Sequence, residues 1–386
     1  MNPIEELRAA KPAHLGDRPV DERTRAAELA RAMSEPRRPA ERRRRAVRPV
    51  WGLGLTGAAA AAVTAAAVVM SGTGTVPEPY EAQHVVTGRP ATEAPAVRLS
   101  ARDVLLAAAE KAGRQAEGSG DYWHTVTVGR SLYVAEQGGY QVMAQDRNEG
   151  WTPSATGGEQ VSISRSLGAR PATEADRTSW EQAGSPSEVR VKVPGKGGEG
   201  KYGLIPLSMS PGKVRADRSP LVDGDKVFWL GRNVTMKELR DLPGEPGKLK
   251  KWLMASYEGH GTESTSEKMS GDAWLFQVSV GLIMDMPVTP EVRGAAFRML
   301  ADLDDVKVAQ HVTDAEGRRG TAVSVEERYE RGGVSENRLI FDEVTGKALA
   351  HEYVVVEPGD MQEGFEPGTV WSSTVLLGAG WTDDRP

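Results

Sequence analysis

Apolar positions along the chain form one long run and many short alternating ones. Residues 50–70, from Val50 to Met70, are 21 consecutive positions without a charge. About 20 apolar residues, each rising about 1.5 Å, span a hydrocarbon core of about 30 Å. The run therefore predicts a transmembrane helix that begins at Val50 and ends at Met70. It is rich in Ala and Gly, and a buried helix of a soluble domain is the alternative.

Basic residues just before this run predict its orientation. They are Arg42, Arg43, Arg44, Arg45 and Arg48. Because Lys and Arg stay on the cytoplasmic side, we expect the N-terminus inside and the C-terminal body outside. A cleaved signal peptide is the alternative, but its apolar region is usually about 7–15 residues long, so the length favours an uncleaved anchor. The lipid bilayer is therefore the first expected partner.

Charge and composition divide the remainder into three segments. Residues 1–49 hold 13 Lys or Arg and 8 Asp or Glu, whereas the rest of the chain holds 35 and 46. This basic leader contains stretches of helical spacing, and it either docks on a cytoplasmic partner or is a solvated leader. Residues 71–99, rich in Pro, Gly and Thr, predict a tether. Residues 100–386 are expected to form an extracytoplasmic domain.

Helical and alternating patterns follow one another in blocks within this domain. Ser100 and Asp103 form the capping-box start of a helix. Alternation over residues 122–128 and 140–146, with a glycine-containing turn between them, predicts a hairpin, and residues 188–193 predict another strand.

The middle third predicts helices. Thr235 and Glu238 form a second capping box. Residues 271–287 are strongly apolar but too short to cross a bilayer, so they predict a core helix. Pro290 suits the first position of the helix that follows.

The last third predicts a meander of short strands. The alternating runs are residues 306–312, 321–329, 337–342, 348–357 and 369–377. Most of the connections between them are short, which favours antiparallel neighbours. Strands, then helices, then strands, indicate the α+β class. We expect one transmembrane helix followed by a curved antiparallel β-sheet packed with helices.

Signatures of catalysis and of metal binding are missing from the sequence. The chain has no Cys, which excludes disulfides, thiolate metal sites and a Cys nucleophile. Its six His residues lie far apart and show no metal-ligand spacing. His124 and His351 fall in predicted strands, where a surface or hydrogen-bonded His is expected. We therefore predict no enzyme activity, no cofactor, no bound metal and no nucleic-acid partner.

One glycine-rich stretch resembles a phosphate-binding loop. Residues 195–201 match G-x-x-x-x-G-K, but Tyr202 replaces the Ser or Thr that would hold Mg²⁺. Such a loop must also lead into a helix whose N-terminus faces the anion. Pro206 and Pro211 break any helix here, so we expect no nucleotide.

Tryptophans are concentrated in the outer domain, which holds eight of the nine. Packing in the core and at its rim is the simpler explanation. The functional alternative is an apolar groove between a curved sheet and its helices, where ligands commonly bind.

Several blocks together resemble a known family. A leader containing "ELRA" precedes the arginine cluster and the Ala-rich anchor, and "DYWHTVTVG", "LRDLPGEPGKLKKWL", "VTPEVRGAAFRMLADLDDVKV" and "RLIFDEVTGKALAHE" follow. These blocks resemble a large actinobacterial family of single-pass membrane proteins of unknown function, often encoded beside extracytoplasmic-function sigma factors. The resemblance implies a protein of the cell envelope and carries over no catalytic residue. The order of elements is also similar to the open half-barrels of lipoprotein carriers and of periplasmic sigma-factor regulators.

Two functional hypotheses follow. In the first, the outer domain is a non-enzymatic module that binds a lipid-like ligand or an envelope protein. The leader then transmits that state to a sigma factor or another cytoplasmic protein. In the second, the chain is a structural protein of the cell envelope with an inert leader.

Overall fold

A large antiparallel sheet dominates the part of the chain that the structure describes. The computed structural model describes residues 100–194, 202–230, 232–261, 268–329 and 333–385. Nine strands form this sheet in the order β6-β3-β2-β1-β13-β12-β11-β10-β9, with antiparallel neighbours throughout. Their bounds are β1 Tyr122–Val134, β2 Gln141–Pro153, β3 Glu159–Pro171, β6 Arg215–Pro220, β9 Lys307–Thr313, β10 Arg319–Tyr329, β11 Gly333–Phe341, β12 Ala348–Pro358 and β13 Val370–Thr382.

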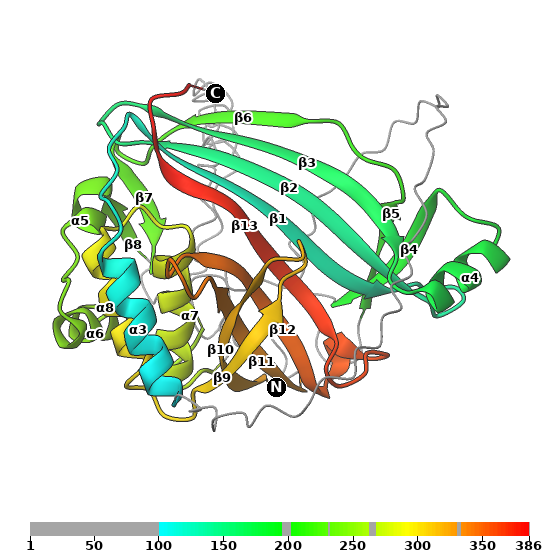
Figure 1. Cartoon of the computed structure of the whole chain (residues 1–386). Coiled ribbons are helices and arrows are strands. Elements are labelled where there is room, and N and C mark those ends of the chain that lie inside the picture. Colours follow the sequence, from blue (N-terminus) through cyan, green and yellow to red (C-terminus); the bar gives the residue numbers. More distant parts are fainter. Residues whose placement is uncertain (1–99, 195–201, 231, 262–267, 330–332, 386) are drawn as a thin grey trace, which may run out of the picture. The chain divides into compact units, whose positions relative to one another are not determined.

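Helices and two small hairpins complete the fold. The hairpins pair β4 (Glu188–Pro194) with β5 (Tyr202–Ser208) and β7 (Lys226–Trp229) with β8 (Arg232–Thr235). The helices are α3 Ala101–Gly113, α4 Glu174–Gln182, α5 Met236–Arg240, α6 Pro246–Met254, α7 Gly271–Met284, α8 Pro290–Leu300 and the 3₁₀ turn η1 Asp360–Gln362. Figure 1 shows α3, α5, α6, α7 and α8 gathered at one end of the sheet, and α4 with the β4–β5 hairpin at the other.

The last strand joins the two halves of the sheet. β13 pairs with β1 on one side, where Trp123 lies opposite Trp381, and with β12 on the other, where His351 lies opposite Thr374. The five consecutive strands β9 to β13 form the antiparallel meander that the sequence predicts. The α+β class is therefore confirmed.

The main core lies between α7 and the sheet. Every residue of α7 from Ala273 to Met284 is buried, because the helix is apolar on all sides and is covered on all sides. It packs on α6 and α8 and reaches β10 and β12. Phe297 of α8 meets Phe341 of β11 edge to face, with ring centroids 5.3 Å apart. The predicted core helix is confirmed.

Helices α3 and α8 approach each other closely at a glycine. A Cβ placed on Gly294 would lie 2.9 Å from the carbonyl oxygen of Ala109, so a larger residue would push the helices apart. Ser100 caps α3 through the predicted capping box with Asp103. Thr289 caps α8, and Pro290 occupies its first turn as predicted.

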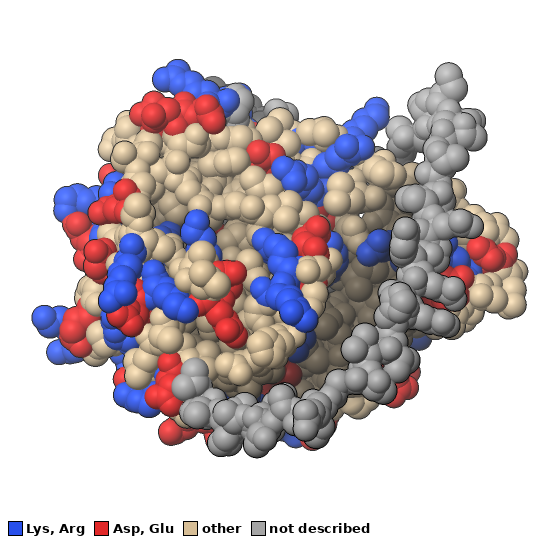
Figure 2. Space-filling model, viewed as in Figure 1, with Lys and Arg blue, Asp and Glu red and all other residues tan. Residues whose placement is uncertain are grey.

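The β9–β10 hairpin bends back over the sheet. His311 adopts a left-handed conformation with φ 58°, and the β9–β10 register shifts next to it, which is the geometry of a β-bulge. Beyond the bend, Glu316 pairs with Arg130 of β1, and Arg318 donates to the backbone carbonyls of Leu349 and Leu376. In Figure 2, Lys, Arg, Asp and Glu side chains gather over this hairpin and over α3.

Several sequence expectations lie outside the described residues. These are the leader 1–49, the transmembrane run from Val50 to Met70 and the tether 71–99. Within the described residues, no helix is long and apolar enough to cross a membrane. The strands β3, β5, β6, β7 and β8 and the helix α4 were not predicted from the sequence.

Candidate functional site

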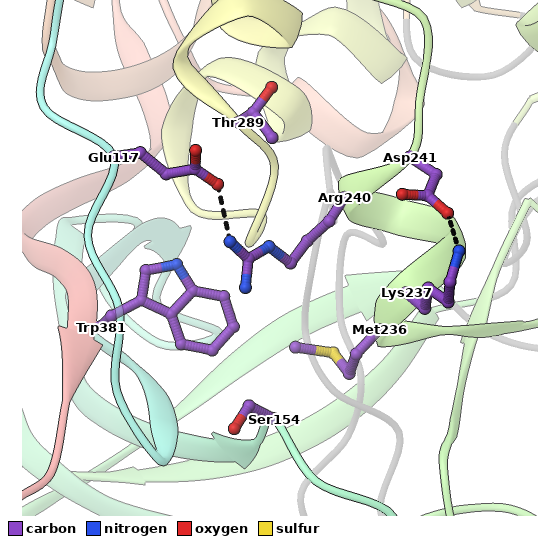
Figure 3. A pocket seen from close by; sticks show the side chains of 8 residues that line it. All are labelled: Glu117, Ser154, Met236, Lys237, Arg240, Asp241, Thr289 and Trp381. Carbon is purple, nitrogen blue, oxygen red and sulfur yellow. Dashed lines mark hydrogen bonds and ion pairs between the residues drawn. The ribbon is translucent and has the colours of Figure 1, made fainter.

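A pocket lies at the end of the sheet where the helices gather, and it encloses about 420 Å³. Its walls come from five places: the segment after α3, the turn after β2, helix α5 with its C-terminal cap, the N-terminal cap of α8 and the end of β13. The lining residues are Glu117, Ser154, Met236, Lys237, Arg240, Asp241, Thr289 and Trp381. Figure 3 shows Arg240 reaching across the pocket from α5 to lie between Glu117 and Trp381.

Helix α5 positions the basic side chains of this pocket. Thr235 accepts a hydrogen bond from the backbone N–H of Glu238, and the Glu238 carboxylate accepts one from the backbone N–H of Thr235, which fixes the first turn. Met236 and Leu239 are buried and anchor the helix. Arg240, one residue after Leu239, is therefore held toward the pocket.

Arg240 and Glu117 form an ion pair across the opening. The Arg240 Nη2 atom lies 2.6 Å from Glu117 Oε1, and the two side chains are 38% and 52% exposed. Ion pairs this exposed contribute little stability, because water screens them and both side chains lose rotamer freedom. Lys237 pairs separately with Asp241 on the same helix, and that hydrogen bond raises the pKa of Lys237.

Trp381 forms the floor behind this ion pair, and the buried Trp123 supports it. The Arg240 guanidinium carbon lies 5.2 Å from the Trp381 ring centroid, a cation–π distance. Trp381 meets Trp123 nearly edge to face at 5.3 Å, and Arg293 of α8 lies 5.4 Å from the Trp123 ring. The Trp123 indole N–H donates to the carbonyl of Asp285 at 2.6 Å. The aromatic floor is therefore held rigidly from β1, β13 and α8.

Arg293 places a second guanidinium behind the floor. It donates to the carbonyl of Met286 at 3.1 Å, and burial lowers the pKa of Arg293 to about 10. Even at that pKa the side chain is charged at neutral pH. Thr289 brings the N-terminus of α8, which carries a partial positive charge, to the pocket wall.

The segment that carries Glu117 runs tightly along β13 because it contains glycines. A Cβ on Gly118 would lie 3.3 Å from the Trp381 ring, and one on Gly120 would lie 2.6 Å from the backbone of Thr382. No other residue type fits at Gly120 without moving one of the two backbones. This contact brings the segment that carries Glu117 next to Trp381.

The lining of this pocket is chemically mixed. Its lining offers two cations, two carboxylates, two hydroxyls, a thioether and an indole, with no His. No group of three or more potential metal ligands occurs among the residues that the structure describes.

The two histidines singled out in the sequence lie on strands, as predicted. His124 lies 2.9 Å from the Glu149 carboxylate and stacks on Trp151. His351 is buried, with Nε2 2.7 Å from Asn337 Oδ1, and burial lowers its pKa to about 3. Both are hydrogen bonded, and neither lines the pocket.

The other sequence candidates do not converge on this pocket. The loop-like motif at residues 195–201 lies outside the described residues, but the segment after it is the strand β5, which removes the helix that a phosphate-binding loop requires. Arg42, Arg43, Arg44, Arg45, Arg48, Val50 and Met70 also lie outside the described residues.

Most of the pocket could not be predicted from the sequence. Trp381 stood out only as one of eight tryptophans, and nothing in the sequence indicated Glu117 or Arg240. The capping box at Thr235 indicated where α5 begins, but nothing local links that helix to residues more than 100 positions away.

Comparisons of the chain with protein-family models, with curated proteins and with solved structures give no match.

Proposed function

We propose that the chain is a single-pass membrane protein whose outer domain is a non-enzymatic binding or sensing module. Residues 50–70 anchor it, the N-terminus lies in the cytoplasm, and residues 100–386 lie outside. The pocket beside Trp381 is its binding site. The leader 1–49 passes the occupancy of this site to a cytoplasmic partner, a sigma factor or another protein.

The pocket is the observation that carries this proposal. Its volume of about 420 Å³ lies within the range typical of small-molecule sites, about 300–1,000 Å³. It combines one indole and one thioether with six polar or charged side chains, so it is more polar than most small-molecule sites and suits a charged ligand.

The binding role is tested by looking for a ligand that copurifies with the whole protein. The full chain is extracted from membranes in a mild detergent, and native mass spectrometry measures the mass bound per chain. We expect a small molecule on the native protein and its loss from the Trp381→Ala variant.

Trp180→Ala is the matched control. Trp180 is a partly buried tryptophan on α4, in the small core that α4 shares with the β4–β5 hairpin. This variant should keep the ligand. Equal occupancy in both variants, or a native protein that carries and takes up no small molecule, contradicts the proposed function.

A further inference from the structure

We propose that the pocket recognises an oxyanion, a phosphate or carboxylate group, which replaces Glu117 at Arg240 while the rest of the ligand contacts Trp381 and Met236. This inference rests on the proposed binding function and names the ligand class for the same site. It gives Glu117 the role of an internal competitor that occupies Arg240 in the empty pocket.

The charges around the pocket favour an anion. Among the lining residues, Lys237 is matched by Asp241, and Arg240 is matched by Glu117. Behind this balanced set are two further positive features, Arg293 and the N-terminus of α8. A ligand carboxylate or phosphate that replaces Glu117 keeps the Arg240 charge matched and lies near the partially positive N-terminus of α8, whereas a cation would face Arg240 directly.

The geometry shows which partner of the ion pair moves. Arg240 is held by α5, whose first turn is capped and whose Met236 and Leu239 are buried, and its guanidinium lies against Trp381. Glu117 lies in the segment between α3 and β1 and is half exposed, so its side chain can turn into water. A guanidinium offers a planar fork of donors that matches a carboxylate or phosphate, and so Arg240 can exchange one oxyanion for another.

The pocket has room for more than the anion. A volume of about 420 Å³ far exceeds a single phosphate group, and the remaining walls include the Trp381 ring and the buried side chain of Met236. An apolar group attached to the anion would cover this surface and gain hydrophobic free energy. The expected ligand is therefore amphipathic, such as a phosphate ester, rather than an inorganic ion.

Isothermal titration of the full chain in a nonionic detergent tests the ligand class, with inorganic phosphate and hexyl phosphate as probes. We expect hexyl phosphate to bind at least about tenfold more tightly than inorganic phosphate, since about 1.4 kcal/mol of apolar contact gives that factor. Equal affinities for the two probes overturn the assignment of Trp381 and Met236 to the apolar part.

Two variants of the ion pair test the exchange at Arg240. Arg240→Gln should weaken hexyl phosphate binding at least about tenfold, because a charge-assisted hydrogen bond is lost. Glu117→Gln should strengthen it several-fold, because it removes the competitor; a merely structural ion pair predicts weakening in both variants. The matched control is the exposed pair Glu174 and Arg177 on α4, where Arg177→Gln and Glu174→Gln should leave the affinity unchanged.

Lipid nanodiscs and free hexyl phosphate distinguish the two possible sources of the oxyanion, a lipid headgroup and a soluble ester. Tighter binding to nanodiscs of phosphatidylglycerol than of phosphatidylcholine, lost in Arg240→Gln, assigns a lipid headgroup. Binding of free hexyl phosphate with no difference between the two nanodiscs assigns a soluble ester.

Failure of every probe, or binding that Arg240→Gln does not change, overturns the inference. A copurified ligand without phosphate or carboxylate that depends on Trp381 overturns this inference alone and leaves the proposed binding function in place.

Discussion

At the scale of single residues, the fold depends on positions where a side chain would collide with backbone. Gly346, in the turn between β11 and β12, has φ 69°, and a Cβ there would lie 2.9 Å from the Ala108 oxygen and from the Ala112 nitrogen of α3. The same turn is tied together by Asp342, whose carboxylate accepts the backbone N–H groups of Val344 and Thr345. One glycine therefore sets how closely α3 packs on the sheet.

Gly346→Ala should destabilise the protein by about 3 kcal/mol, because a left-handed Ala is strained and the new methyl group meets the backbone of α3. Chemical denaturation followed by tryptophan fluorescence measures this loss. Gly317 is the matched control, with φ 79° and nothing within 4 Å of the added Cβ, so Gly317→Ala should lose only the strain, about 1 kcal/mol. Equal losses for the two variants would show that the contact with α3 is not tight.

His351 makes the stability depend on pH. Its pKa falls from 6.5 to about 3 because the ring is buried, so the unfolded chain binds the extra proton between those values. The contribution of His351 to the free energy of unfolding is therefore fully present above pH 6.5. It is lost as the pH falls toward 3, by up to about 1.4 kcal/mol per pH unit. Burial also raises the pKa of Glu352, which acts in the opposite sense, since stability then falls as the pH rises.

Comparing variants isolates the contribution of His351. The difference in unfolding free energy between the native protein and His351→Gln should shrink steadily as the pH is lowered through this window. His260, whose side chain is 42% exposed and pairs with Glu258, is the control, and His260→Gln should follow the native curve. A difference between native protein and His351→Gln that does not change with pH would mean that His351 takes up its proton at the same pH in the folded protein as in the unfolded chain.

At the scale of elements, local sequence signals predicted the helices better than the strands. Ser100 and Thr235 mark helix starts through capping boxes with a residue three positions on, and Pro290 does so through its fixed φ at the first helical position; all three helices begin where expected. The strand β3 was missed because its apolar positions do not alternate cleanly: its pattern of buried residues is interrupted where Gly168, with φ 87°, accommodates a register shift against β2.

The pocket was not predicted because it depends on contacts between elements far apart in the chain. Glu117 and Arg240 are 123 positions apart, and Trp123 and Trp381 meet only because β13 inserts next to β1. No periodic pattern encodes that neighbourhood. The meander of β9 to β13 was predictable because short turns make sequence neighbours into spatial neighbours.

The β9–β10 hairpin is held over the sheet by a buried carboxylate. The Asp314 side chain is fully buried and accepts hydrogen bonds from the backbone N–H groups of Glu316 and Arg318 and from the Arg318 guanidinium. Asp314→Ala should cost about 3 kcal/mol, because it leaves Arg318 without its charge partner. Hydrogen exchange at the amides of β9 and β10 should speed up first.

Lys307 provides the comparison on the same hairpin. It pairs with Glu326, and both side chains are largely exposed, so Lys307→Ala should leave stability and exchange unchanged. Slow, native-like exchange in the Asp314→Ala hairpin would show that the bulge at His311, and not the buried carboxylate, fixes its position.

At the scale of the whole molecule, the proposed function requires the two ends of the chain to lie on opposite sides of a membrane. The described residues build their core from helices and strands between Ser100 and Thr382, and the pocket lies entirely within them. A ligand outside and a partner inside can communicate only through the anchor. Orientation is therefore the property on which every later step depends.

Arg42, Arg43, Arg44, Arg45 and Arg48 should set that orientation. Alkaline phosphatase fused after Pro386 should be active, and green fluorescent protein fused there should be dark if it is exported unfolded, because the proposed topology puts the domain outside the cytoplasm. Replacing the five arginines together by Gln should lower phosphatase activity and raise fluorescence, since the basic flank no longer retains the N-terminus inside. Replacing five exposed basic residues of the outer domain, Arg170, Arg177, Lys192, Lys248 and Lys251, should change neither signal. In the unmodified chain, an inactive phosphatase together with a fluorescent green fluorescent protein would place the pocket in the cytoplasm. That result would overturn the proposed function, which requires the pocket to lie outside.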